Sequence, residues 1–157
     1  NLVNHGLADR AWLNWPSRLE ELEKLCRSYS GLAAKACWQK ITHVALVKFN
    51  NDPKTIYEFC DTAGILEATR SCKINALGIM AVSMRHDFEK TRMLCEALKE
   101  NEPALLEFCY NYLVLSILSN VPDSGGKALE FCGSLEQKFR ESCFSTIDRY
   151  KRREISS

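Results

Sequence analysis

The sequence has no large excess of charge of either sign and no long apolar run. Its 157 residues include 21 Lys and Arg against 20 Asp and Glu, which gives a net charge of +1. A balance this even provides no general field that would attract nucleic acid or an anionic membrane surface, so we expect no nucleic-acid partner. The longest apolar stretch, Tyr112 to Val121, is interrupted by Ser116, Ser119 and Asn120 and is far too short to cross a bilayer. Membrane insertion is therefore not expected.

Catalytic and metal-binding motifs are also missing. The sequence contains no C-x-x-C, H-E-x-x-H or G-x-S-x-G pattern and no complete Gly-rich phosphate loop. Its three histidines, His5, His43 and His86, are not at the spacing of zinc ligands. We therefore expect no catalytic residue, no metal site and no cofactor, and a protein that is not an enzyme. Because the sequence begins at Asn1 without a signal-peptide pattern, we expect a processed mature protein or a piece of a longer one.

Apolar residues recur at steps of three and four, which is the period of an amphipathic α-helix. Two such stripes are Leu19, Leu22, Leu25, Cys26 and Phe139, Cys143, Ile147, Tyr150. The sites that are typical of helix starts are Ser17 with Glu20, Asp52 with Pro53, Asp87, and Asp123 or Ser124. The alternation typical of strands is absent. With 46% hydrophobic residues the chain can bury a core, and we predict an all-α fold.

The cysteines divide the chain into similar units. They are Cys26, Cys37, Cys60, Cys72, Cys95, Cys109, Cys132 and Cys143, separated by 11, 23, 12, 23, 14, 23 and 11 residues. Units of roughly 34 to 37 residues, with one cysteine near the end of a first helix and one near the start of a second, fit a helix-turn-helix repeat array. We predict a single domain, 1–157, that forms an α/α-hairpin solenoid of about four repeats, each cross-linked by one disulfide. The predicted repeats are 17–50, 52–86, 87–121 and 123–157.

Apolar residues keep a constant distance from the cysteines in every unit. Two such columns lie directly before the first cysteine and four residues after the second, and we predict that they are core positions: Leu25, Phe59, Leu94, Phe131, Ile41, Ala76, Leu113 and Ile147. Trp12 and Trp15 share their columns with Leu46 and Phe49, which favours buried packing over ligand binding. Residues 1–14 align with the second helix of a unit, with Val3 at the cysteine position. We therefore predict that they form an N-terminal capping helix.

Two schemes of disulfide pairing are compatible with the spacing. In antiparallel helices, residues at equal distances from the turn lie side by side, which favours the pairs Cys26–Cys37, Cys60–Cys72, Cys95–Cys109 and Cys132–Cys143. The alternative scheme joins cysteines across the constant 23-residue gaps and leaves Cys26 and Cys143 unpaired. Disulfides predict an oxidising compartment, so that the protein is secreted, periplasmic or on the cell surface. Reduced cysteines that serve as small core residues are the other interpretation.

The spacing and neighbours of the cysteines also resemble a known class. An apolar residue before one cysteine and an aromatic residue beside the next recur at Phe59-Cys60 to Cys72, Leu94-Cys95 to Phe108-Cys109-Tyr110, and Phe131-Cys132 to Cys143-Phe144. This pattern, from about Ser17 to Lys151, is similar to the cysteine-paired α/α repeats of secreted bacterial proteins, in the Sel1-like and tetratricopeptide class. The resemblance implies that a face of the solenoid binds a protein or a peptide.

The sequence therefore favours a non-enzymatic, extracytoplasmic protein-interaction module that presents a rigid helical surface. The alternative is a structural subunit that packs against copies of itself or within a larger surface assembly. An enzyme or a carrier of a small apolar ligand is the least favoured class. No ligand-binding residue can be named from the sequence, and the edge of variable turns or the helical face beside it is the expected position of a binding surface.

Overall fold

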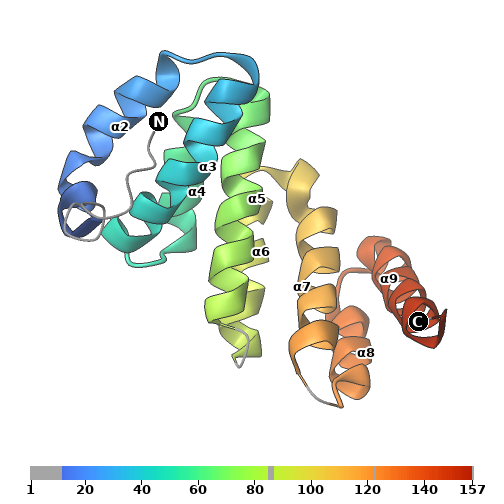
Figure 1. Ribbon diagram of the computed structural model, residues 1–157. Coiled ribbons are helices and arrows are strands. Elements are labelled where there is room, and N and C mark those ends of the chain that lie inside the picture. Colours follow the sequence, from blue (N-terminus) through green and yellow to red (C-terminus); the bar gives the residue numbers. More distant parts are fainter. Residues whose placement is uncertain (1–11, 85–86, 122, 157) are drawn as a thin grey trace. The chain divides into compact units, whose positions relative to one another are not determined.

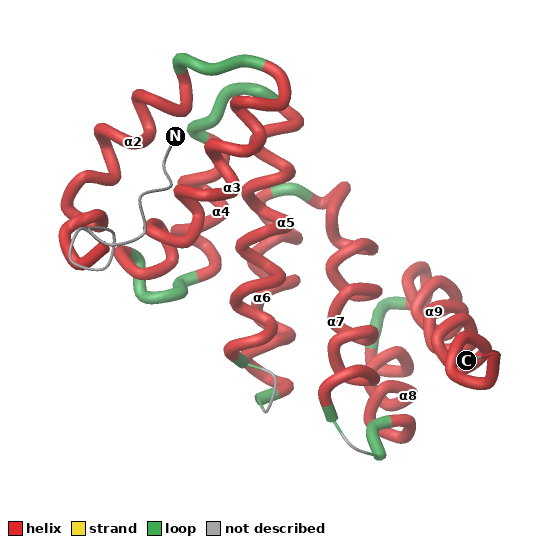
Figure 2. The backbone as a smooth tube through the Cα atoms, viewed as in Figure 1, coloured by secondary structure: helices red, strands yellow, loops and turns green. Residues whose placement is uncertain are grey.

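The computed structural model describes residues 12–84, 87–121 and 123–156. Within these residues it contains eight α-helices, two 3-10 helices and no strand (Figures 1 and 2). The prediction of an all-α fold is confirmed. In the described part of the chain, no helix is both long and apolar enough to span a membrane.

The chain divides into two compact units, Asn1–Ala76 and Leu77–Ser157, with the boundary inside a helix. The single domain over 1–157 stays a prediction, and each unit is described by itself. The predicted capping helix over residues 1–14 lies outside the described residues except for its last three, which begin a 3-10 helix.

The first unit contains two helical hairpins (Figure 1). Its elements are η1 (Trp12–Arg18), α2 (Leu19–Arg27), α3 (Gly31–Lys48), α4 (Pro53–Asp61) and α5 (Leu66–Ser83), the last of which continues into the second unit. Helices α2 and α3 form the first hairpin, and α4 with the first part of α5 forms the second. η1 packs on both α2 and α3.

The second unit contains two further hairpins. Its elements after α5 are α6 (Phe88–Asn101), η2 (Pro103–Leu105), α7 (Leu106–Asn120), α8 (Gly125–Ser134) and α9 (Gln137–Ser156). Helix α7 packs on α6, α8 and α9, and therefore lies at the centre of this unit. Each of the four sequence ranges predicted to hold a hairpin contains one pair of helices.

Two of the predicted helix starts have the expected side-chain cap. The Asp52 carboxylate accepts a hydrogen bond from the Thr55 backbone N–H at the start of α4, and Asp87 accepts one from Lys90 N–H at the start of α6. The prediction at Ser17 is wrong, because η1 runs directly into α2 and its carbonyl groups can take the place of a side-chain cap. Ser124 precedes α8 at the N-cap without a side-chain hydrogen bond.

The core contains most of the apolar columns. All four residues that follow a second cysteine by four positions are buried: Ile41, Ala76, Leu113 and Ile147. In the column before the first cysteine, Phe59 and Leu94 are buried but Leu25 is 48% exposed, so burial of Leu25 is a wrong prediction. Trp15 is half-buried, and the side chain of Trp12 lies outside the described residues. Leu25 lines an open groove between α2 and α3.

The cap of α4 makes stability depend on pH. Hydrogen bonds from the Thr55 hydroxyl and backbone N–H lower the pKa of the Asp52 carboxyl in the folded protein. Its contribution to stability is therefore present above about pH 4 and is lost as the pH falls through the folded-state pKa. We expect Asp52→Ala to lower the free energy of unfolding by about 1 kcal/mol at neutral pH. Urea unfolding at neutral and acidic pH measures this loss.

Asp52→Asn is the matched control, because asparagine caps helices without a titrating group. It should retain most of the stability at every pH. An Asp52→Ala loss that is just as large near about pH 2 would contradict the role of the charged cap.

Candidate functional site

All eight cysteines form disulfides, and each disulfide joins the two helices of one hairpin. The pairs are Cys26–Cys37, Cys60–Cys72, Cys95–Cys109 and Cys132–Cys143, with Cα–Cα distances of 5.4, 5.6, 5.7 and 5.6 Å. No cysteine is free. These are the pairs of the intra-hairpin scheme, and none of the bonds spans a 23-residue gap.

The cysteines occupy the same place in every hairpin. In α2, α4, α6 and α8 the cysteine is the eighth residue of the helix, as counted for example from Leu19 to Cys26. In the second helix it is the seventh residue from Gly31, Leu66 and Gln137, and in the third hairpin the seventh from Pro103, where η2 begins. In the second helix this position is nearly two turns from the connecting loop, whereas Cys26 and Cys60 in the first helix are each one residue from the end of the helix.

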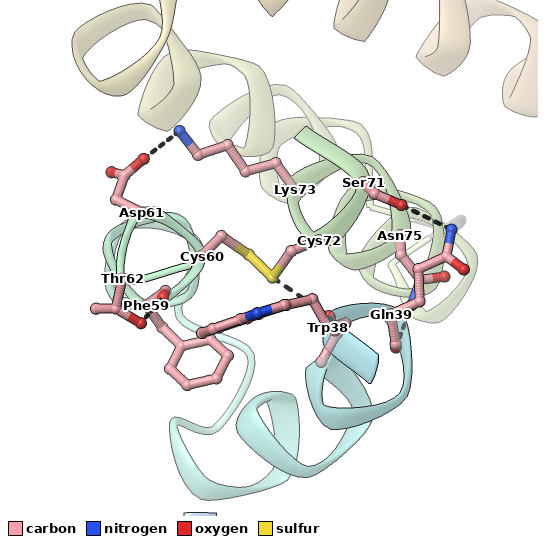
Figure 3. The surroundings of a disulfide bond; sticks show 11 residues. Trp38, Gln39, Phe59, Cys60, Asp61, Thr62, Ser71, Cys72, Lys73 and Asn75 are labelled. Atoms are coloured by element: carbon pink, nitrogen blue, oxygen red, sulfur yellow. Dashed lines mark hydrogen bonds and ion pairs between the residues drawn. A yellow bond between two sulfur atoms is a disulfide. The ribbon is translucent and has the colours of Figure 1, made fainter. Parts of the chain in front are cut away.

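The surroundings of Cys60–Cys72 show how the first hairpin packs on the second (Figure 3). The Trp38 ring of α3 is fully buried, and its centroid lies 5.5 Å from that of Phe59, the residue before Cys60. Thr42, one turn further along α3, places its hydroxyl oxygen 3.3 Å from the sulfur of Cys72. The disulfide of one hairpin is therefore covered by the second helix of the hairpin before it.

Hydrogen bonds also hold α3 against α5. The Gln39 side chain donates to the Ser71 hydroxyl over 2.7 Å, and the Asn75 amide donates to the Gln39 carbonyl over 2.8 Å (Figure 3). Since α3 also packs on α4, it lies in the groove between the two helices of the following hairpin.

The second unit repeats these contacts at matching positions. The ring centroid of Tyr110, the residue directly after Cys109, lies 6.2 Å from that of Phe131, the residue before Cys132. The Asn111 side chain donates to the Ser142 hydroxyl over 2.9 Å, just as Gln39 donates to Ser71 in the first unit. Helix α7 therefore fills the groove between α8 and α9 in the way that α3 fills the groove between α4 and α5.

The groove between α2 and α3 is open. Its volume is about 510 Å³, and its lining residues come from η1, α2, α3 and the turn between these two helices. The lining is mainly apolar: Trp15, Leu22, Leu25, Cys26, Tyr29, Ala33, Ala36, Cys37, Lys40, Ile41, His43 and Val44. We call this surface the α2/α3 groove.

Exposure shows that, among the described residues, no α-helix occupies the α2/α3 groove in the way that α3 and α7 occupy theirs. Leu25 is 48% exposed, whereas Phe59 at the same place in the second hairpin is 5% exposed. Ala36 is exposed, whereas its counterpart Ser71 is buried. Seven half-cystines are fully buried, and only Cys37, in the wall of this groove, is partly exposed. The wrong prediction at Leu25 therefore has its cause here, because apart from η1 no described helix packs in this groove.

The two walls of the groove differ in charge. Helix α3 contains lysines and a histidine but no acidic residue, and Lys40 and His43 line the groove. On α2, the Glu23 carboxylate already forms an ion pair with Arg27 over 2.7 Å. The α3 wall is therefore the more positive one.

The groups with shifted pKa values lie away from this groove. Burial raises the pKa of the Tyr57 hydroxyl in α4. A 2.7 Å hydrogen-bonded ion pair between Lys99 and Glu136 raises the pKa of the lysine and lowers that of the glutamate. The pair connects the end of α6, in the third hairpin, to the turn between α8 and α9, in the fourth hairpin. Among residues 12–84, 87–121 and 123–156, no cluster of His, Cys, Asp or Glu side chains is arranged to hold a metal ion.

The sequence pointed to the cysteines as disulfide partners but not to the groove. A signal was nevertheless present, because Ala36 stands where Ser71 and Ser142 accept a hydrogen bond from the preceding helix. The residues that fill the occupied grooves, Trp38 and Tyr110, were visible only as aromatic neighbours of a cysteine. No protein-family model matches the chain, and comparisons with curated proteins and with solved structures found no match.

Tryptic mapping without reduction tests the pairing directly. Trypsin sites separate the two cysteines of every hairpin and also the cysteines on either side of every 23-residue gap, so each scheme gives its own linked peptides. We expect four linked pairs, one for each hairpin. Reduced and alkylated protein is the control, and linked peptides that span a 23-residue gap, or free thiols at most positions, would contradict the structure.

An ion pair with a buried lysine, beside the second disulfide, gives another prediction. Lys73, the residue after Cys72, is 2% exposed, and its ammonium lies 2.6 Å from the Asp61 carboxylate, which is 45% exposed (Figure 3). Asp61→Asn removes the carboxylate but leaves the buried charge, so we expect a loss of unfolding free energy on the order of 1–3 kcal/mol. Chemical denaturation measures it.

Lys73→Met is the matched variant, because it keeps the buried length of the side chain and removes the charge. Adding Asp61→Asn to the Lys73→Met variant should lower the free energy of unfolding much less than Asp61→Asn does in the unsubstituted chain. Equal costs in the two backgrounds would show that the ion pair contributes nothing.

Proposed function

We propose that this chain is an α/α-hairpin repeat protein of the solenoid type that works as a non-enzymatic protein-interaction module outside the reducing cytosol. The observation that carries the proposal is the open, apolar α2/α3 groove, whose counterparts between α4 and α5 and between α8 and α9 are each filled by a helix. A groove of this kind is a recognised means of binding a helix of another protein.

The disulfides support both the compartment and the role. Four intrachain bonds fit an oxidising compartment, since the cytosol keeps most thiols reduced. Each closes a loop of 11 to 14 residues and is worth about 3 kcal/mol in the chain-entropy model. Short helices such as α2 and α4, with nine residues each, are marginal alone. The bonds therefore keep the two walls of a groove in place before a partner arrives.

The constant positions of the cysteines support the repeat. Duplicate contacts, Trp38 with Phe59 and Tyr110 with Phe131, occur at matching places in the two units. In a repeat protein, each hairpin packs on the next one with the same geometry, so the same contact is expected at the same spacing. The repeat also agrees with the resemblance to the Sel1-like and tetratricopeptide class, which implies peptide or protein binding.

The groove fits a helix better than an enclosed small ligand. Its volume is within the range of about 300–1,000 Å³ typical of small-molecule pockets. However, such pockets enclose most of their ligand, whereas Leu25 and Tyr29 in the lining of the α2/α3 groove are 48% and 43% exposed. An elongated partner can cover these side chains along the groove.

Affinity capture tests the proposed function. Immobilised native protein, incubated with the extracellular and envelope fractions of the source organism, should retain a small set of proteins in stoichiometric amounts. Protein that has been reduced and alkylated is the control and should lose them, because its hairpins are no longer cross-linked. Equal capture by both forms would count against a binding surface that depends on the fold.

Light scattering separates the module from a structural subunit. A monomer that stays monodisperse over a wide concentration range favours the interaction module. Assembly that grows with concentration would favour the alternative, a subunit that packs against copies of itself.

A further inference from the structure

We infer that the α2/α3 groove binds an amphipathic helix of another protein that carries one aromatic residue and acidic residues on the side facing α3. This inference rests on the proposed interaction role and adds the chemistry of the partner. Its basis is that the chain fills two equivalent grooves with helices of its own, α3 and α7, whose side chains show what the site accepts.

The aromatic residue follows from the occupied grooves. Trp38 and Tyr110 occupy matching positions, and each lies against the side chain that precedes the first cysteine of the next hairpin, Phe59 or Phe131. Leu25 is the corresponding side chain of the α2/α3 groove and is exposed. Aromatic anchors in apolar pockets dominate many interfaces, so a partner aromatic over Leu25 would supply much of the affinity.

Beside Leu25, the α2/α3 groove has other residues than the occupied grooves have at the same positions, and these differences indicate which partner it selects. Ser71 and Ser142 accept a hydrogen bond from an amide, but Ala36 at that place cannot, so the partner residue beside it is small or apolar. Asn75, which donates to a carbonyl of the occupying helix, is replaced by Lys40. With His43 beside it on a helix without acidic residues, Lys40 favours a carboxylate on the partner.

A second copy of this chain is a poorer occupant. Its α9 is the helix that corresponds to α3 and α7, and Phe144, which is 36% exposed, would be the aromatic. However, Asp148 stands where Thr42 and Val114 are fully buried. Docking α9 in the same manner would bury this carboxylate beside Cys37, which is costly unless it is paired.

A peptide derived from the chain itself is the probe. A fluorescein-labelled peptide of residues 31–49 with Cys37→Ser and Gln39→Ala, and with Glu in place of Lys35, Lys40 and Lys48, combines the Trp38 contact of α3 with a small residue beside Ala36 and an acidic outer face. We expect saturable binding to the full chain by fluorescence anisotropy. Adding Trp38→Ala to the peptide should weaken binding about tenfold or more, and the peptide with the three lysines kept should bind several-fold more weakly at low salt.

Variants of the full chain locate the site. Ala33→Gln/Ala36→Gln adds uncharged bulk inside the groove and should abolish binding. Leu32→Gln/Val47→Gln places the same residues on the same helix outside the groove lining, where both side chains are exposed, and should leave binding unchanged. Circular dichroism and peptide mapping confirm that both variants fold with four disulfides. Equal binding by the two variants, or no effect of Trp38→Ala in the peptide, overturns the inference.

Three further outcomes each overturn the inference. Binding that is seen only after Val3→Asp/Leu7→Asp would assign the groove to the chain's own N-terminal segment. Concentration-dependent dimers that Ala33→Gln/Ala36→Gln abolishes would assign it to a second copy. If this variant captures the same proteins as the unsubstituted chain in the affinity experiment, the groove is not the site although the interaction role holds. The interaction role itself fails when the native chain captures nothing beyond its reduced and alkylated control.

Discussion

A single disulfide in each hairpin, between the eighth residue of the first helix and a residue two turns into the second, sets the geometry on which the other contacts depend. Helices of nine or ten residues, such as α2, α4 and α8, would not hold their position by local interactions alone. The bond fixes their separation, with Cα–Cα distances of 5.4 to 5.7 Å. The two helices so joined form the walls of the groove in which α3 and α7 pack.

The groove is the place where one hairpin recognises another. In each unit an aromatic residue after the second cysteine packs against the residue before the next first cysteine, and an amide two positions after the cysteine donates to a serine. Apolar contact provides the area, and the hydrogen bond sets the register along the helix. The first hairpin offers the same surface with Leu25 and Ala36 in these places. This likeness, with its differences at Leu25 and Ala36, is the basis of the proposal that the groove binds a helix of another protein.

Part of this organisation could be predicted because it depends on local order in the sequence. The period of the apolar residues identified the helices, and Asp52 and Asp87 marked two helix starts correctly. The capping box at Ser17 failed because a 3-10 turn precedes α2, which is a property of the path of the chain and not of the motif. The column containing Leu25 predicted burial correctly for Phe59 and Leu94 and wrongly for Leu25. Burial requires a neighbour from elsewhere in the chain, and a column of apolar residues does not say whether that neighbour is present.

The sequence by itself determined the all-α class and the hairpin ranges and favoured one of two disulfide schemes, since these depend on residues that are close along the chain; the structure has the favoured scheme. The tertiary structure decided which apolar faces are filled and which is open. It placed Trp38 and Tyr110 in the grooves of the following hairpins, and it left Leu25, Ala36 and Cys37 accessible. The physical reason is that a groove exists only when two helices have been brought together, and whether it is occupied depends on a third helix that lies further away in the sequence.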